Sequence, residues 1–147
     1  MDKTPVIIGY DAVSPLGLDW DQQWERATNG DSGIAPLTRF PLREEFPVLV
    51  SGELDEIDPG SYDFLKPRAL AQWPSPIFKY AMLTVHRALE KCGLEITPEL
   101  APRTAITFSS AVGGQDAVIN ADRLLNKSGK LPHPSTNPNS CINMVGG

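Results

Sequence analysis

The residue with the clearest chemical potential is Cys141, because its thiol lies where a helix is expected to begin. The positive end of a helix dipole lowers the pKa of a thiol and favours the nucleophilic thiolate. A nucleophile also needs a base, and no recognisable histidine partner adjoins Cys141 in the sequence. We therefore interpret Cys141 as a small residue that packs where the helix begins.

The histidines do not indicate a metal site. Cys92 follows His86 on a predicted helix, and the spacing puts their side chains on well-separated faces at about 100° per residue. His86 falls among polar residues of that helix, and His133 lies in a proline-rich loop. We expect no metal and no cofactor. We also expect Cys92 and Cys141 to be reduced, because the N-terminus lacks the layout of a secretory signal.

The glycines of Val112-Gly113-Gly114 raise the question of a phosphate-binding loop. A dinucleotide fingerprint needs Gly-x-Gly-x-x-Gly, and a Walker loop needs Gly-x-x-x-x-Gly-Lys followed by Ser or Thr. Neither pattern is present in the sequence. A tight turn between a strand and a helix, where glycine supplies unusual φ angles, explains the motif better. A nucleotide-binding α/β domain stays as a competing hypothesis.

Composition narrows the class of protein. The chain has 147 residues, 41% of them hydrophobic and 21% charged, which is typical of a soluble globular domain. Its formal net charge of -5 argues against a nucleic-acid surface, and no apolar stretch approaches the length of a membrane span. We expect a cytoplasmic protein without nucleic-acid or membrane partners. The acidic residues between positions 53 and 58 are interpreted as a solvated loop.

Three short apolar runs, at residues 5–10, 48–52 and 104–109, predict strands. These strands would position the cysteines, the histidines and the glycine-bearing turn described above. The first and third runs do not alternate apolar and polar residues, which is typical of strands covered on both faces in a parallel sheet. Two long loops are expected, over residues 31–47 and 127–139.

Shorter helices are predicted between the strands. One follows Asp19 as N-cap, with Gln22 at the reciprocal position of a capping box and Gly30 as the stop. Another covers residues 115–126, and a last one begins at Cys141 with Asn139 or Ser140 as its cap. One or two helical turns are expected between residues 55 and 73.

The strongest helical pattern covers residues 75–92, with Ser75 as a cap, Pro76 in the first turn and Gly93 as the end. The apolar face that this periodicity predicts consists of Ile77, Phe78, Ala81, Met82, Val85, Ala88, Leu89 and Cys92. A stripe this broad indicates a largely buried helix.

Strands alternating with helices favour an α/β fold with a mostly parallel central sheet. Two or three parallel strands cannot cover one another, and the last apolar segment ends at Gly146-Gly147. We therefore expect residues 1–147 to be an incomplete domain whose remainder is absent.

Five segments, in order, resemble an elongating β-ketoacyl-acyl-carrier-protein synthase of type II. They comprise the first strand and its turn at residues 6–17, the helix and turn with Trp24 and residues 29–34, the helix end at residues 88–94, the glycine-bearing turn at residues 109–114, and residues 138–147. The resemblance covers the chain from Val6 to its last residue and places it in the N-terminal portion of the family.

This resemblance implies the N-terminal half of a thiolase-like fold, built from αβαβα layers, in a homodimer. It implies 3-oxoacyl-[acyl-carrier-protein] synthase activity, which is an acyltransferase activity: the decarboxylative Claisen condensation of an acyl thioester with malonyl-carrier protein in fatty-acid or polyketide synthesis. The implied partners are acyl carrier protein and acyl and malonyl thioesters. The catalytic cysteine and histidines of the family match no position of this chain, so the chain by itself is expected to be inactive.

The resemblance also implies residues that neighbour the site. Val112 and Gly113 match the turn that borders the acyl pocket, and Ser135 and Thr136 match a loop near the pocket of the dimer partner. The remaining implied positions are the dimer-interface residues Asn143 and Met144.

The sequence departs from the family at three places. Ser109-Ser110-Ala111 replaces a turn that is richer in glycine in the family. Asp11 stands where the family commonly has glycine, and residues 72–76 replace an entry to the long helix that is rich in arginine and aspartate. These departures motivate a second hypothesis, in which the parent protein is a non-catalytic partner subunit that resembles a chain-length factor.

Overall fold

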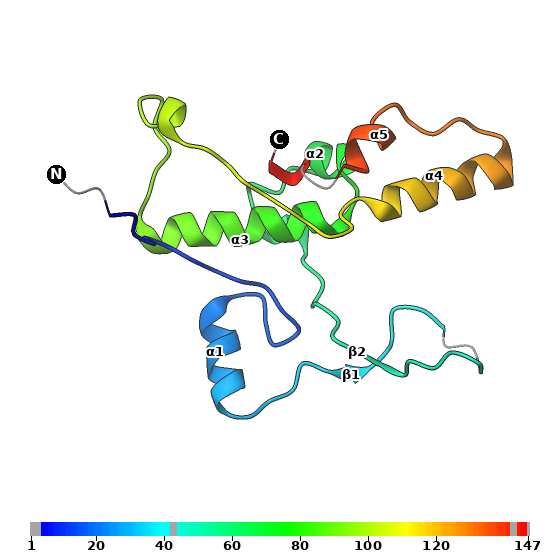
Figure 1. Ribbon diagram of the computed structural model, residues 1–147, viewed down its shortest axis with the longest axis horizontal. Helices are drawn as coiled ribbons and strands as arrows, with labels where there is room; N and C mark the ends of the chain where they lie inside the picture. Colours follow the sequence, from blue (N-terminus) through cyan, green and yellow to red (C-terminus); the bar gives the residue numbers. More distant parts are fainter. Residues whose placement is uncertain (1–3, 42–43, 142–143, 147) are drawn as a thin grey trace. The chain divides into compact units, whose positions relative to one another are not determined.

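The computed structural model describes residues 4–41, 44–141 and 144–146, which form mainly helices (Figure 1). The chain divides into two compact units that we treat separately. The first unit contains residues 1–57 and 83–94, and the second contains residues 58–82 and 95–147. The longest helix, α3 (Pro76–Cys92), contributes residues to both units.

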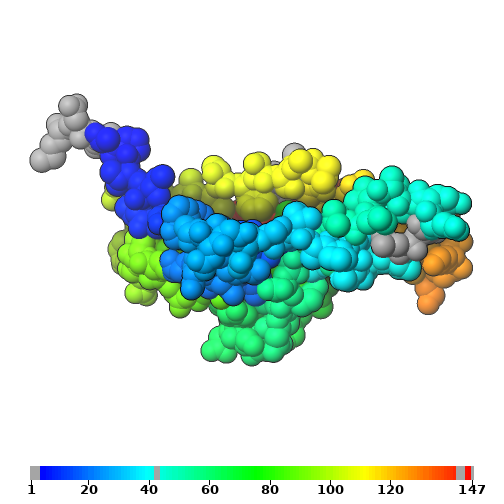
Figure 2. All heavy atoms as spheres, turned by 90° about the horizontal axis from the view of Figure 1, so that it is seen from below, coloured from blue at the N-terminus to red at the C-terminus, as the bar shows by residue number. Residues whose placement is uncertain are grey.

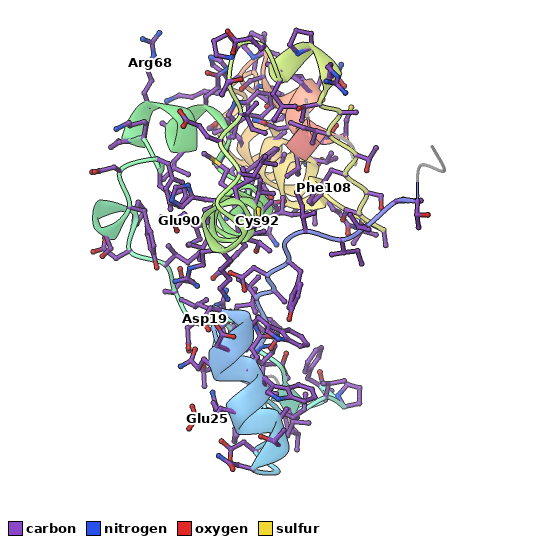
Figure 3. The ribbon with its side chains drawn as sticks, turned by 90° about the vertical axis from the view of Figure 1, so that its left-hand side faces the viewer. Asp19, Glu25, Arg68, Glu90, Cys92 and Phe108 are labelled. Carbon is purple, nitrogen blue, oxygen red and sulfur yellow. The ribbon has the colours of Figure 1, made fainter. Side chains whose placement is uncertain are left out.

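Helix α1 (Trp20–Thr28) of the first unit begins and ends where the sequence predicts. The Asp19 carboxylate, at the start of the helix in Figure 3, accepts a hydrogen bond from the Gln22 N–H at 2.9 Å, which satisfies one free donor of the first turn. The reciprocal capping-box bond is replaced: Gln22 Oε1 accepts from the Leu18 N–H at 3.2 Å. Gly30 follows the helix with φ +81°, as expected of its stop.

The predicted parallel sheet is wrong for the residues that the structure describes. Their one sheet is antiparallel and has two strands, β1 (Ala35–Pro36) and β2 (Val50–Ser51). Residues 5–10 and 104–109 form no strand. The second predicted strand, at residues 48–52, is confirmed only as the short β2.

The physical reason lies in what a strand needs. An extended run becomes a strand only when a neighbouring chain supplies ladder hydrogen bonds, and a run apolar on both faces also needs a covering layer. The described residues supply neither to these two runs, so Ile7 is 86% exposed and Ile106 is 73% exposed. Figure 2 shows the N-terminal run, in dark blue, with its side chains uncovered.

The segments around the two strands are held by the acidic residues that the sequence assigns to a solvated loop. Glu53 accepts hydrogen bonds from the Thr38 hydroxyl at 2.6 Å and from the N–H groups of Thr38 and Arg39, both at 3.0 Å. Glu56 lies 3.4 Å from the Arg39 guanidinium. These acids therefore organise a hairpin-like turn at the surface.

Replacing Thr38 with valine is expected to raise the pKa of Glu53. The Thr38 hydroxyl is the largest cause of the lowered pKa of this carboxyl, and the Thr38 N–H is the next. Since the folded-state pKa is depressed, the stabilisation is present above the unfolded-state pKa and is lost as the pH falls through the folded-state pKa. Carboxyl NMR titration measures the change. Thr28→Val is the control, because the Thr28 hydroxyl bonds only carbonyls of α1, and an unchanged Glu53 pKa in Thr38→Val would contradict the assignment.

Helix α3 forms where predicted, but its buried face differs from the predicted stripe. The best-buried side chains of α3 are Phe78, Tyr80 and Leu83, and Val85 is more than half exposed. The early turns of α3 carry apolar residues around most of the circumference, so periodicity alone does not select the face that packs. Gly93, with φ +65°, ends the helix as expected.

The second unit contains two further predicted helices. Helix α4 (Gln115–Ser128) confirms the pattern over residues 115–126, and α2 (Pro67–Gln72) with the 3₁₀ turn η1 (Pro59–Ser61) confirms the helical turns expected before Trp73. A further 3₁₀ turn, η2, covers Ala101–Arg103.

The C-terminal part differs from the prediction. A short helix, α5 (Thr136–Asn139), lies inside the expected loop, because Pro138 is tolerated in the first turn of a helix. The helix expected to begin at Cys141 is absent at Cys141 itself, and a 3₁₀ turn, η3, covers Met144–Gly146. Residues 142–143 lie outside the described part. Within that described part, no helix combines the length and the apolar character of a membrane span.

Candidate functional site

The candidate site of the second unit is organised by the turn before α4. Gly114 is the N-cap of α4 and has φ +78°, in the left-handed region that favours glycine. A Cβ at this position would lie 2.1 Å from the Asn139 carbonyl oxygen and 2.7 Å from Ser140 Cα. The start of α4 therefore packs directly against the backbone at the end of α5.

Two buried polar side chains join the surrounding elements. Asn139 is 3% exposed, and its side-chain amide donates to the Gln72 carbonyl at 3.0 Å, which links α5 to α2. Ser75 is also buried, and its hydroxyl donates to Asp116 Oδ1 at 2.9 Å, which links the start of α3 to the first turn of α4. Buried polar groups stabilise a fold when they are hydrogen-bonded in this way.

These links frame a pocket of about 510 Å³ between α2, α4 and the segment that leads into α5. Its lining is mixed. The apolar lining residues are Ala71, Pro74, Ala117, Ala121, Leu124 and Pro132. The polar lining residues are Arg68, Gln72, Asp116, Asn120, His133, Ser135, Thr136 and Asn139. A cavity with an apolar wall and a few convergent polar groups is typical of small-molecule sites.

The structure brings together only part of the predicted site. Ser135 and Thr136 line the pocket. Val112 and Gly113 lie in the turn before α4 and are not among its lining residues; the nearest atoms to a Cβ at Gly113 would be those of Ser110, at 3.0 Å. For the predicted interface, Met144 begins η3, and Asn143 lies outside the described residues.

Sequence reasoning missed the residues that complete the pocket. Arg68, Asn120 and Asn139 carry no local signal, because they come from three separate helices that meet only in the folded unit. Asn139 was expected as the cap of a following helix and is instead the last residue of α5. The one sequence signal near it is Pro138, which is compatible with a first helical turn.

The two thiols are free and are held by carbonyls one turn back along the chain. Cys92 Sγ lies 3.3 Å from the Leu89 carbonyl oxygen, and Cys141 Sγ lies 3.6 Å from the Asn137 carbonyl oxygen. Cys92 is partly buried, which agrees with its predicted packing role. Cys141 is exposed and no helix begins at it, so the prediction that it packs at the start of a helix is wrong. His86 Nε2 lies 3.4 Å from the Glu90 carboxylate on the surface of α3, as its polar surroundings predict.

The first unit contains a second cluster of charged residues. The Asp11 side chain is fully buried, and its Oδ1 accepts hydrogen bonds from the N–H groups of Ala12 and Trp20, both at 2.8 Å. Lys91 Nζ lies 3.6 Å from Asp11 Oδ1 and 3.0 Å from Asp21 Oδ2. Asp21 and, to a smaller extent, Asp11 raise the pKa of Lys91.

A raised pKa keeps the Lys91 ammonium protonated, so the cluster does not supply a nucleophilic amine. Asp11 instead ties the N-terminal segment to the first turn of α1 and to the end of α3. The close approach of that segment is also visible at Gly9, where a Cβ would lie 2.6 Å from the Ala88 carbonyl oxygen and 2.9 Å from Cys92 Cβ. The cluster is structural.

Comparison with known proteins gives consistent results. The chain is 33% identical to 3-oxoacyl-[acyl-carrier-protein] synthase 2 of Coxiella burnetii over 149 residues, which cover 100% of this chain and 35% of the relative. The synthase 2 of Vibrio harveyi is 28% identical with the same coverage. That of Staphylococcus aureus (strain COL) is 29% identical over 129 residues, covering 87% of this chain and 30% of the relative. The chain spans about a third of the length of these curated relatives. No family model matches it.

Proposed function

Because the chain is homologous along its whole length to 3-oxoacyl-[acyl-carrier-protein] synthase 2, a β-ketoacyl synthase, we propose that it forms part of such a synthase. The parent protein would then catalyse decarboxylative Claisen condensation. An acyl group moves from acyl carrier protein to a cysteine thiolate, malonyl-carrier protein loses carbon dioxide, and the carbanion attacks the acyl thioester and releases the thiolate. The observation that carries this proposal is the alignment over 100% of the chain.

The same homology supports the proposed architecture. The parent is a cytoplasmic homodimer with a thiolase-like fold, and it acts in fatty-acid or polyketide synthesis. In that architecture the apolar runs at residues 5–10 and 104–109 become strands, which agrees with their exposed side chains here. Asn143 and Met144 belong to the proposed dimer interface.

In the proposed reaction, this chain contributes residues that line the substrate pocket and does not contribute the nucleophile. The pocket lined by Ser135 and Thr136 has an apolar wall from α4, formed by Ala117, Ala121 and Leu124, which suits an acyl chain. Val112 presents an exposed apolar side chain beside Gly113, and this turn is the second proposed acyl contact. Acyl chains gain most of their affinity from burial of apolar surface, so small side chains on this wall favour longer substrates.

A condensation assay of the parent protein tests the proposal. Acyl- and malonyl-carrier protein together should yield carbon dioxide and the 3-oxoacyl product, and neither carrier alone should yield that product. Absence of product with every acyl length from two to sixteen carbons, tested at roughly physiological substrate levels, would contradict it. Product formation only after addition of a complete synthase would instead support the second candidate, a non-catalytic partner subunit. The buried Asp11, at a position where glycine is expected, is the observation that favours this candidate.

Replacing Ala121 with tryptophan is expected to narrow the pocket. We expect kcat/KM for the longest accepted acyl chain to fall about tenfold and that for acetyl to change little, because a lost apolar pocket is worth roughly one to three kcal/mol. The control is Ala101→Trp, at an exposed position of η2. Equal loss for short and long substrates would contradict the assignment of this wall to the acyl chain.

A further inference from the structure

Helix α1 ends at Asn29-Gly30, which is the only Asn-Gly pair in the sequence. In such a pair the glycine nitrogen can attack the asparagine side chain, because the second residue has no side chain to hinder the approach. Both residues are exposed, and a Cβ at Gly30 would meet nothing within 4 Å. The Asn29 side-chain amide makes no hydrogen bond to any residue that the structure describes. The two reacting groups are therefore unhindered and open to water.

The backbone at the end of the helix holds these groups apart. The Gly30 N–H donates to the Ala27 carbonyl at 3.1 Å, so this nitrogen must leave its acceptor before it can react. Asn29 has ψ -6°, so the peptide bond to Gly30 must also rotate before its nitrogen faces the side chain. Both changes are confined to the last turn, which is the part of a helix that opens most readily. Opening of this turn is sufficient for the reaction, without unfolding of the unit.

We propose that Asn29 is a site of spontaneous modification, which converts it to aspartate and isoaspartate whenever the last turn of α1 opens. The Gly30 nitrogen forms a bond to Asn29 Cγ, the bond from Cγ to Nδ2 breaks, and the leaving nitrogen takes up the proton from Gly30 and departs as ammonia. Water then opens the cyclic imide. Hydrolysis at Cγ gives aspartate, and hydrolysis at the main-chain carbonyl gives isoaspartate. Water is the one co-reactant.

Both products weaken the same end of the helix. Each places a carboxylate at the C-terminus of α1, where the helix dipole already concentrates negative charge. Isoaspartate also adds a methylene group to the main chain, so the N–H groups that follow it no longer match the carbonyls of the last turn. Arg26 connects this turn to its surroundings, since it donates to the Leu16 carbonyl at 2.8 Å and to Asp31 Oδ2 at 3.2 Å. Modification therefore loosens the contacts of Arg26 as well.

Timed peptide mass spectrometry of the folded full chain in neutral buffer tests the proposal. We expect the Asn29 peptide to exchange NH₂ for OH and to contain more isoaspartate than aspartate, which marks the cyclic route. Asn29→Gln is the matched control and should stay unmodified, because glutamine would have to close a larger ring. Asn139-Ser140 is an internal control: Asn139 is 3% exposed, its amide donates to the Gln72 carbonyl, and it should react only in denaturant.

Two variants test whether opening of the last turn sets the rate. Arg26→Ala loses the bond to the Leu16 carbonyl and should speed the modification about fivefold, since the loss of an ordinary hydrogen bond raises the open fraction by that factor. Asp31→Ala loses an exposed ion pair and should speed it about twofold. An unchanged rate in Arg26→Ala would overturn the role of opening. Persistence of Asn29 in the folded chain while it converts in denaturant, or aspartate formed without isoaspartate, would overturn the site itself.

Discussion

Replacing Gly114 with alanine is expected to lower the free energy of unfolding of the second unit by about 4 kcal/mol. The new Cβ would lie 2.1 Å from the Asn139 carbonyl oxygen, which is backbone and cannot rotate away. The residue also has φ +78°, which strains any side chain. Helix α4 must separate from α5 to relieve the contact, and the pocket between them would open.

Gly129 provides the matched control. It follows α4 with φ +64°, and a Cβ there would meet nothing within 4 Å. Gly129→Ala therefore carries only the backbone strain, about 1 kcal/mol. Trp73, whose ring lies 5.2 Å from that of Phe78, reports unfolding of this unit by fluorescence once Trp20 and Trp24 are replaced by phenylalanine. Equal effects of the two glycine substitutions would show that α4 and α5 are not in direct contact.

Replacing Asp11 with alanine is the second large prediction, with an expected loss of about 3 kcal/mol in the first unit. The carboxylate is fully buried and accepts from two backbone N–H groups, so its removal leaves both without this acceptor, while Lys91 keeps its ion pair with Asp21. Hydrogen bonds to charged groups are the stronger kind. Asp11→Asn keeps one oxygen acceptor and is expected to lose about 1 kcal/mol.

Asp21→Ala is the control for Asp11, because Asp21 contacts the same lysine from an exposed position on α1. An exposed ion pair contributes at most about 1 kcal/mol, so this variant should unfold close to the unsubstituted chain. The backbone N–H of Trp20 donates to Asp11, so the fluorescence of Trp20 reports unfolding of the first unit in denaturant titrations. If Asp21→Ala proved as damaging as Asp11→Ala, the Lys91 ion pair rather than the two backbone bonds would carry the stabilisation.

Asp11 also bears on the proposed function. The position is commonly glycine in the family that the sequence resembles, and here it carries a buried charge that joins the N-terminal segment, α1 and α3. A residue that links three segments cannot be exchanged without compensation elsewhere. Condensation assays of Asp11→Gly in the parent protein would therefore report on stability first and on chemistry second, and both should be measured together.

The helices were predictable because their signals are local. Asp19 caps α1 through a residue three positions away, and Gly30 and Gly93 stop their helices through their own φ angles. The patterns of α3 and α4 extend over several turns, so errors at one position matter little. Short α5 was missed, because a single turn rich in proline and asparagine has no periodicity to detect.

The family resemblance was also within reach of the sequence, because ordered motifs survive where the identity is about 30%, and the comparisons confirm it. The strands were not predictable in the same way. An apolar run such as residues 104–109 has a high propensity to form a strand. The neighbouring strand with which it would form hydrogen bonds must, however, come from a distant segment. Among the described residues that partner is missing, and the run belongs to no strand.

The amino-acid order by itself determined where α1, α3 and α4 begin and end, and which family the chain resembles, since these depend on neighbours within a few turns or on motif order. Only the tertiary structure decided which face of α3 is buried, that Asp11 carries an interior charge, and that Ser135 shares a pocket with Arg68 and Asn120. These features depend on groups that are remote in sequence. Their energies arise from desolvation and contact, which exist only after the chain has brought the groups together.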